Sequence, residues 1–471
     1  MDLCRGRFTE EIDKLVRDFT SSIKLDKKLY KYDIAGSTAH VKMLSKCGII
    51  KEIEAEKILC ALKEIEKDIE KGKLNFNQKE DIHLAIEEEV IKRAGEVGEK
   101  LHTARSRNDQ IALDERLYLR EEIGQIIVLI NDFQKTLLGL AEKNLQVIMP
   151  GYTHLQYAQP ILFSHHLLAY FWMLERDKER FKDSCRRVNV MPLGAGALAG
   201  TSLRIDREYV AKLLAFPKVS ENSLDTVGDR DYIIEFLSAA AILMMHLSRL
   251  SEDFILWSSP AFSFIQVSDA FATGSSVMPQ KKNPDVAELI RGKTGKVYGH
   301  LVSLLTTMKA LPLSYNRDMQ EDKLPLFETI EVVKTSLKLY AKMFSHIKID
   351  KDSMRKEAEK GFFAATDLAD YLVEKGVPFR KAHQLIGAII KYCLEEGKGF
   401  EGLTLSDYQK FSSSFGKDVF GRIKLDSCVF NKESAGGTGK KSLARQIKEA
   451  KKAISSKPVL GLNPTATRCE I

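Results

Sequence analysis

Apolar residues recur at three- and four-residue spacing along most of the chain, which is the periodicity of an amphipathic α-helix. No proline interrupts this pattern from Asn108 to Ile148, and Pro150-Gly151 follows it. At 1.5 Å per residue, the segment predicts a single helix of about 60 Å. A second long helix is expected from Asp229 to Trp257. Its middle, Phe236 to Leu247, is apolar nearly all round, which indicates burial on every side.

Further long helices are expected after Pro284 and after Pro325, and beyond about Asp350 glycines divide the chain into shorter elements. The pattern therefore predicts an all-α protein built on an elongated bundle. We expect an N-terminal helical domain (1–104), a central long-helix bundle (105–352) and a small C-terminal helical domain with a tail (353–471). A helix that is apolar all round packs on more neighbours than one chain supplies, so self-association is expected.

Composition narrows the function. The chain has 471 residues, of which 44% are hydrophobic, enough for a large core. Its net charge of +7 comes from interspersed residues, which favours anionic small molecules over nucleic acid as partners. Seven cysteines without a Cys-x-x-Cys pair indicate reduced thiols in the cytoplasm and no metal site. No uncharged apolar stretch reaches about 18 residues, so no membrane partner is expected.

One polar segment, 274–285, lies between two apolar helical segments. Gly274, Pro279 and Pro284 exclude a continuous helix or a central strand. A serine, Ser275, precedes a lysine, Lys281, by six residues. On a loop, such a lysine can stabilise a developing negative charge and help the serine to lose its proton. Composition alone leaves a solvated connection as the more common interpretation.

Two glycine-rich segments imitate nucleotide sites but lack their context. Residues 194–199 match a dinucleotide fingerprint, yet neither an immediate helix nor a βαβ pattern accompanies them. Residues 436–442 evoke a phosphate-binding loop, but Ser434 stands where its first glycine belongs and Lys441 where a Ser or Thr should follow the lysine. We therefore predict no nucleotide cofactor.

The start of the first long helix carries Ser106, Arg107 and Asn108. These residues suit an ordinary helix N-terminus, and equally a carboxylate cradle made with the free backbone N–H groups. At the other end of the same helix, Thr153 and His154 follow a turn. Residues 315–323 form a mixed-charge turn before the next helix, which by itself is typical of a solvated face.

As strings, these segments resemble the fumarase/aspartase superfamily of lyases. Residues 274–283 are similar to its signature Gly-Ser-Ser-x-Met-Pro-x-Lys-x-Asn, and the segments at 105–108 and 315–323 look like those of its argininosuccinate lyase family. Matching motifs run in the family's order over about residues 5–450. The start departs from the pattern, with Cys4-Arg5-Gly6-Arg7-Phe8 where the family has Trp-Gly-Gly-Arg-Phe, so the role of that segment stays open.

The resemblance implies anti elimination of argininosuccinate to arginine and fumarate, with no cofactor and no metal. It assigns Ser275 as the base that removes the Cβ proton, although Ser276 stays an alternative. Lys281 would stabilise the carboxylate, and His154, with Glu288 as acidic partner, would deliver a proton to the leaving nitrogen. The implied substrate-binding residues are Ser22, Asp26, Asp81, His83, Ser106, Arg107, Asn108, Thr153, Asn283, Tyr315, Gln320 and Lys323.

The family resemblance also implies a homotetramer with each site built from three chains. Two alternatives remain open. A sister lyase acting on adenylosuccinate, malate or aspartate would share the 274–283 signature but should lack the segments at 105–108 and 315–323. A non-catalytic homologue of the crystallin kind would keep the fold, and retention of Ser275, His154, Lys281 and Glu288 argues against it.

Overall fold

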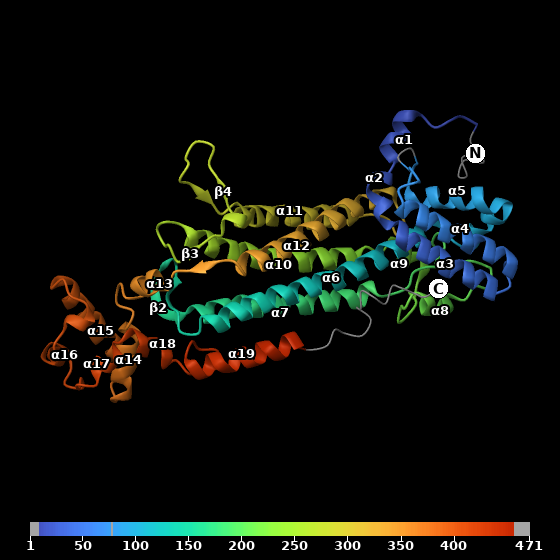
Figure 1. The fold of residues 1–471 in the computed structure, drawn as a ribbon. Coiled ribbons are helices and arrows are strands. Elements are labelled where there is room, and N and C mark those ends of the chain that lie inside the picture. The colour runs from blue at the N-terminus through green and yellow to red at the C-terminus, as the bar shows by residue number, and fades with distance from the viewer. Residues whose placement is uncertain (1–8, 77–78, 456–471) are drawn as a thin grey trace.

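The computed structural model of this protein describes residues 9–76 and 79–455. The variant start at residues 4–8 and the tail beyond residue 455 lie outside this range. Long helices run side by side through the middle of the molecule (Figure 1). The N-terminal helices cover one end of this bundle and a small helical unit lies at the other. The predicted all-α class with a central long-helix bundle is confirmed.

Five long helices make the bundle: α6 (Arg107–Lys143), α7 (Phe163–Val188), α10 (Asp231–Ser258), α11 (Asp285–Met308) and α12 (Lys323–Phe344). Helix α6 packs on α7 and α12, and α10 packs on α7 and α11. The first predicted helix ends earlier than expected, because β1 (Ile148–Thr153) pairs antiparallel with β2 (Gln156–Leu162). Pro325 lies inside the first turn of α12, where its missing N–H leaves no hydrogen bond unmade.

Helix α10 shows how far one chain covers its own apolar surface. Among the described residues it alone is long and apolar enough, by length and composition, to cross a membrane. However, 61% of the most apolar 18-residue stretch of this helix is already buried within this chain, where it packs against α7, α11 and α12. The burial that the sequence predicted on every side is therefore largely provided by the bundle.

The N-terminal end of the bundle is covered by shorter helices, of which α3 packs on α4 and α6, and α4 packs on α5. Their bounds are α1 (Lys14–Thr20), α2 (Ile23–Asp26), η1 (Lys27–Leu29), α3 (Tyr30–Lys46), α4 (Glu52–Glu70), α5 (Ile82–Ala94) and η2 (Gly95–His102). Two helices between α7 and α10 complete this end: α8 (Arg207–Leu213) and α9 (Ser223–Gly228).

Beyond α12 the chain builds a separate small core from buried residues between 364 and 428. Its elements and their flanks are α13 (Lys351–Ala358), α14 (Ala365–Glu374), α15 (Phe379–Glu395), η5 (Phe400–Gly402), α16 (Leu405–Phe411), α17 (Val419–Arg422), α18 (Leu425–Phe430) and α19 (Lys440–Ser455). Helix α19 leaves this core and packs back on α6 and α7.

The segment that imitates a phosphate loop immediately precedes α19. The Glu433 carboxylate accepts hydrogen bonds from the backbone N–H groups of Lys441 and Ser442, at 3.1 and 3.0 Å. An acidic side chain of the same chain thus occupies the start of the helix, where a phosphate would otherwise be favoured.

Candidate active site

Most of the residues expected to bind substrate lie at the N-terminal end of the bundle, whereas Thr153 and Asn283 do not. Arg107 is the first residue of α6, and Ser106 caps that helix in a capping box with Asp109. The Arg107 guanidinium forms an ion pair with Asp81, which itself caps α5 by accepting from Leu84 N at 2.7 Å. Two helix starts from distant parts of the chain therefore meet in one charged contact. Helix N-termini favour anions, so this end suits a carboxylate ligand.

Asp26 connects α2 to the same place. Its carboxylate accepts from the Ser22 hydroxyl and from Ile82 N, the latter at 3.2 Å. Gln320, in the 3₁₀ turn η4 (Arg317–Asp322), donates to the Thr20 carbonyl at 3.2 Å. Ser22, Asp26, Asp81, Arg107 and Gln320 thus belong to one continuous contact region.

Asn108 and Asp109 hold the glycine-rich segment that imitates a dinucleotide fingerprint. Asp109 is fully buried and accepts from Gly194 N and Gly196 N at 2.9 and 2.8 Å. The Asn108 amide donates to the Ala197 carbonyl at 3.1 Å. The backbone donors of this loop therefore bind a carboxylate of α6, which explains the glycines without a nucleotide.

Lys323 lies below the surface of this end of the bundle and belongs to a buried ionic cluster. Its ammonium is 2.9 Å from Glu115 and 3.3 Å from Asp322, and the Arg230 guanidinium pairs with both carboxylates. Burial would raise the pKa of Glu115, but Lys323 and Arg230 hold it well below its usual range. Tyr315 comes before Asp322 and Lys323 in the sequence and is partly buried. This burial raises the pKa of its hydroxyl.

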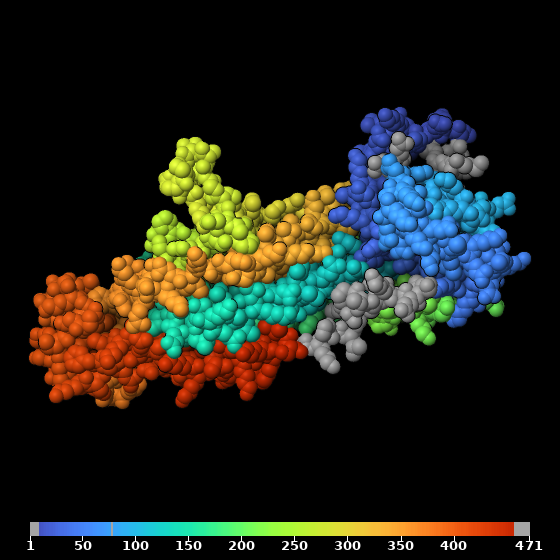
Figure 2. All heavy atoms as spheres, viewed as in Figure 1, coloured from blue at the N-terminus to red at the C-terminus, as the bar shows by residue number. Residues whose placement is uncertain are grey.

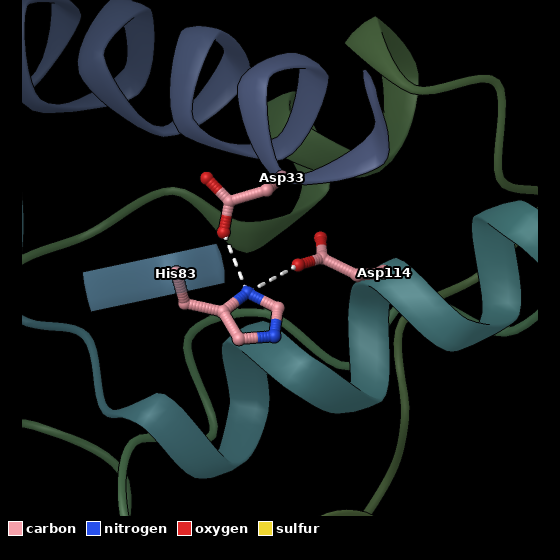
Figure 3. A group of neighbouring side chains, drawn as sticks. All are labelled: Asp33, His83 and Asp114. Carbon is pink, nitrogen blue, oxygen red and sulfur yellow. Dashed lines mark hydrogen bonds and ion pairs between the residues drawn. The ribbon is translucent and has the colours of Figure 1, made fainter. Parts of the chain in front are cut away.

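His83 is likewise enclosed. Its ring is fully buried, and Nδ1 lies 2.7 Å from an Asp33 oxygen and 3.1 Å from an Asp114 oxygen (Figure 3). His83 and Lys323 therefore face other protein charges in this structure, whereas the Arg107 side chain keeps part of its surface exposed. The sequence motifs did not reveal Asp33, Asp114, Glu115 or Arg230, since on single helices they look like ordinary surface charges.

Thr153 and His154 lie at the opposite end of the bundle, on the β1–β2 hairpin. Thr153 pairs with Gln156, so His154 and Leu155 form the two-residue turn, each with a φ of 56°. Turns of this kind require positive φ, which favours Asn-Gly, and a non-glycine residue there costs about 1–2 kcal/mol. Strain retained at an exposed side chain that can carry a proton is typical of a functional position.

The 274–285 segment is at this second end as well. Strand β4 (Thr273–Gly274) pairs antiparallel with β5 (Lys282–Asn283), and the loop between them stands out from the body of the molecule (Figure 2). The Ser275 hydroxyl oxygen accepts from Val277 N at 3.2 Å and Met278 N at 3.0 Å. Hydrogen bonds donated to this oxygen stabilise its deprotonated form.

Lys281 is exposed in this loop, and Glu288 is exposed in the first turn of α11. Among the described residues, none of the identified hydrogen bonds or ion pairs joins Glu288 to His154. Asn283 is partly buried in β5. The second end therefore offers a serine, a cation, an imidazole and a carboxylate, all directed away from the packed core.

The two groups of residues are far apart within one chain. Helix α6 separates Arg107 from the β1–β2 hairpin, and its 37 residues span about 55 Å. Helix α10, of 28 residues, separates the Arg230 cluster from the segment that leads to Ser275. One copy of this fold therefore separates the predicted site residues into two groups, here called half-sites, at opposite ends of its bundle.

Comparison with known proteins places this arrangement in a family. A model described as Lyase matches residues 6–299, and one described as Argininosuccinate lyase C-terminal matches residues 362–430. The argininosuccinate lyase of Syntrophotalea carbinolica is 57% identical over 447 residues, covering 95% of this chain and 97% of that protein. The chain belongs to the argininosuccinate lyase family. The Geobacter metallireducens argininosuccinate lyase is 56% identical, covering 95% of this chain and 98% of that protein.

Solved structures share this fold. EDDS lyase in complex with formate aligns with a TM-score of 0.82 at 26% identity, covering 93% of this chain and 88% of that one. The fumarate lyase from Mesorhizobium sp. BNC1 aligns with a TM-score of 0.73 at 18% identity, covering 96% of this chain and all of that one (100%). The second likeness shows the fold alone. As a member of the argininosuccinate lyase family, the chain is an enzyme, a lyase that acts on a small molecule.

Proposed function

We propose that this enzyme cleaves argininosuccinate by anti elimination, releasing arginine and fumarate. The observation that carries the proposal is the match to argininosuccinate lyases over nearly the whole chain, at 57% identity with one of them. The reaction must remove a weakly acidic Cβ proton beside a carboxylate. It must also stabilise the aci-carboxylate that forms and protonate the departing guanidino nitrogen.

Ser275 is proposed as the base. A neutral serine is a poor base, so its alkoxide needs stabilisation, and the N–H groups of Val277 and Met278 already point at its oxygen. Ser276 is exposed, and no backbone donor to its hydroxyl is among the hydrogen bonds identified in the described residues. These observations favour Ser275 over Ser276. Lys281 and Asn283 follow on the same loop, where they would stabilise the growing charge of the substrate carboxylate.

His154 is proposed to deliver the proton to the leaving nitrogen, with Glu288 as its acidic partner. Thr153, beside it, would contact the substrate. The residues proposed to bind substrate at the other end are Ser22, Asp26, Asp81, Ser106, Arg107, Asn108, Tyr315 and Gln320, with His83 and Lys323 acting from beneath them.

Both half-sites are needed, so we propose a homotetramer whose chains bring opposite ends together. A glycine-bearing face of α11 supports this: a side chain added at Gly292, Gly295 or Gly299 would meet nothing within 4 Å. Tyr298 and Val302, 43% and 60% exposed, lie nearby on the same helix. An open face with small and apolar residues is suited to another helix.

We also propose a cytoplasmic location. The five cysteines within the described residues are all unpaired, as expected in a reducing compartment.

The test of the proposed function is direct. Purified protein is mixed with argininosuccinate, and fumarate is followed by its ultraviolet absorbance. Release of fumarate and arginine supports the assignment. Release of fumarate from adenylosuccinate but not from argininosuccinate would overturn the proposed substrate. Absence of turnover with both compounds would favour a non-catalytic role.

A further inference from the structure

A buried charged cluster at the substrate end has a geometry that the elimination chemistry does not itself use. Asp33 comes from α3, His83 from α5 and Asp114 from α6, and all three side chains are at most 1% exposed. One ring nitrogen, Nδ1 of His83, faces both carboxylates (Figure 3). Burying ionised groups is costly unless they compensate each other, so the cluster must balance its own charge.

A metal ion is one way to balance it, because the three ligand atoms lie within 4.8 Å of one another. The neighbours supply another way. Gln110 donates to Asp33 at 2.6 Å, and Arg105, also buried, donates to Ser37, which lies 3.5 Å from the second Asp33 oxygen. A protonated His83 and Arg105 give two positive charges against two carboxylates. The cluster is then neutral without a metal.

The protonated state is favoured by the surroundings of the ring. Burial by itself would lower the pKa of His83, but hydrogen bonds and charge from Asp114 and Asp33 raise it to about 10. Burial and the charge of Asp33 raise the pKa of Asp114, whereas the hydrogen bond and charge of His83 lower it, so the ionised form of Asp114 depends on the imidazolium that faces it. The charged groups that face the ring are Asp33 from α3, Asp114 from α6, and Asp26 and Asp81 beside the start of α5, with Arg105 just before α6.

His83 lies directly behind two proposed substrate-binding carboxylates. It is two residues from Asp81 and one from Ile82, whose N–H binds Asp26. Burial raises the pKa of Asp26, and the charge on His83 is the largest effect that opposes this rise. For Asp81, Arg107 and then His83 overcome burial and hold the pKa below its usual range.

We propose that Asp33 and Asp114 hold His83 as a permanent imidazolium, which fixes the start of α5 and keeps Asp26 and Asp81 ionised, so that Asp81, whose side chain is 12% exposed, receives a cationic group of the substrate. This inference rests on the proposed function. His83, Asp33 and Asp114 are positioning residues in it, because none of them has surface available to the substrate. Argininosuccinate carries an ammonium and a guanidinium, and cations of this kind form charge-assisted hydrogen bonds with a carboxylate such as that of Asp81.

The first experiment needs no turnover and uses the full chain. Solid-state nuclear magnetic resonance of protein with ¹⁵N-labelled histidine is recorded from about pH 6 to about pH 9, a range below the His83 pKa. His83→Gln identifies the His83 signals, and His383→Gln on the exposed part of α15 serves as the assignment control. Both His83 nitrogens are expected at the imidazolium position throughout. A neutral ring with one unprotonated nitrogen would overturn the proposal, whether or not the protein cleaves argininosuccinate.

Elemental analysis of the same protein, purified without chelator, tests the metal alternative. Bound metal well below one equivalent is expected. One equivalent of bound metal in the unaltered protein, absent from the His83→Gln variant, would overturn the proposed imidazolium, because the metal would take the place of the Nδ1 proton.

The second experiment separates positioning from packing. Asp114→Asn leaves His83 with one carboxylate, so its ring should titrate in the neutral to alkaline range. The KM for argininosuccinate is then expected to rise about tenfold between about pH 7 and about pH 9, with little change in kcat. The matched control is Asp132→Asn, which alters an exposed carboxylate of the same helix. An unchanged pH profile of KM in a folded Asp114→Asn variant would contradict the proposal.

Discussion

At the scale of single residues, the most informative contact is the acceptance of two backbone N–H groups by the Ser275 oxygen. Ser276 is the next residue along the chain and is more exposed than Ser275. Identical chemistry in two adjacent side chains provides a matched comparison, because both substitutions remove one hydroxyl from the same loop.

Ser275→Ala is expected to lower kcat by about 10²–10⁴-fold, the usual contribution of a positioned base. Ser276→Ala should retain activity within about tenfold, because its loss leaves the base in place. Fumarate release under saturating substrate measures both. The assignment of the base would be reversed if Ser276→Ala were the more damaging change.

The proposed imidazolium of His83 leads to a second prediction, which concerns how the free energy of unfolding depends on pH. The folded pKa of His83 is about 10 and its ordinary value is 6.5, so the folded state binds an extra proton between these values. This contribution is complete below about pH 6.5 and is lost as pH rises through about 10. The resulting slope is about −1.4 kcal/mol of unfolding free energy per pH unit in that window.

Hydrogen exchange of the slowest amides, followed across that window, measures the slope. His83→Gln should be less stable near neutral pH and should flatten the profile, because glutamine does not titrate. Equal slopes in the two proteins would show that His83 does not carry the effect.

At the scale of elements, the helices could be predicted and their partners could not. The periodicity of α6, α10 and α11 is local, so the residues alone placed these helices within a few positions. The end of α6 differed because β1 and β2 pair with each other, and pairing depends on a second segment. The same limit applies to the site: motifs predicted Arg107 and Lys323, whereas Glu115 and Arg230 acquire meaning only when the start of α10 meets α6.

The contact between the segment before α19 and the start of α7 is another long-range feature, and it is testable. Thr438 Oγ1 accepts from Leu162 N at 2.9 Å, and both residues are buried. Thr438→Ala would leave that N–H without a partner, at a cost of about 1–3 kcal/mol. Faster amide exchange at Leu162, measured by mass spectrometry, is the expected sign. Thr438→Ser keeps the oxygen and should retain most of the protection.

At the scale of the whole molecule, the separation of the two half-sites gives the sharpest test of the proposed tetramer. Arg107→Leu and Ser275→Ala change opposite ends of the bundle, and each alone should be almost inactive. When the two chains are co-expressed, a site that takes each residue from a different chain is intact in about one quarter of cases, by random assortment. Fumarate release by the purified mixed assembly should therefore recover to about that fraction.

A site completed within one chain gives the opposite result, because every chain in the mixture would carry one inactivating change. Recovery of essentially no activity in assemblies shown to contain both chains would refute the shared site. Mixing the two purified proteins without exchange of chains is the control, and it should stay inactive.

The length of α6 also has a consequence for the enzyme in solution. In the proposed shared site a dissociated chain holds no complete site, because the 37 residues of α6 keep Arg107 and His154 apart in every isolated chain. Specific activity would then fall on dilution, with a lag on reconcentration while chains find each other again. The concentration at which activity halves would report the strength of association, so a kinetic assay would serve as a binding measurement.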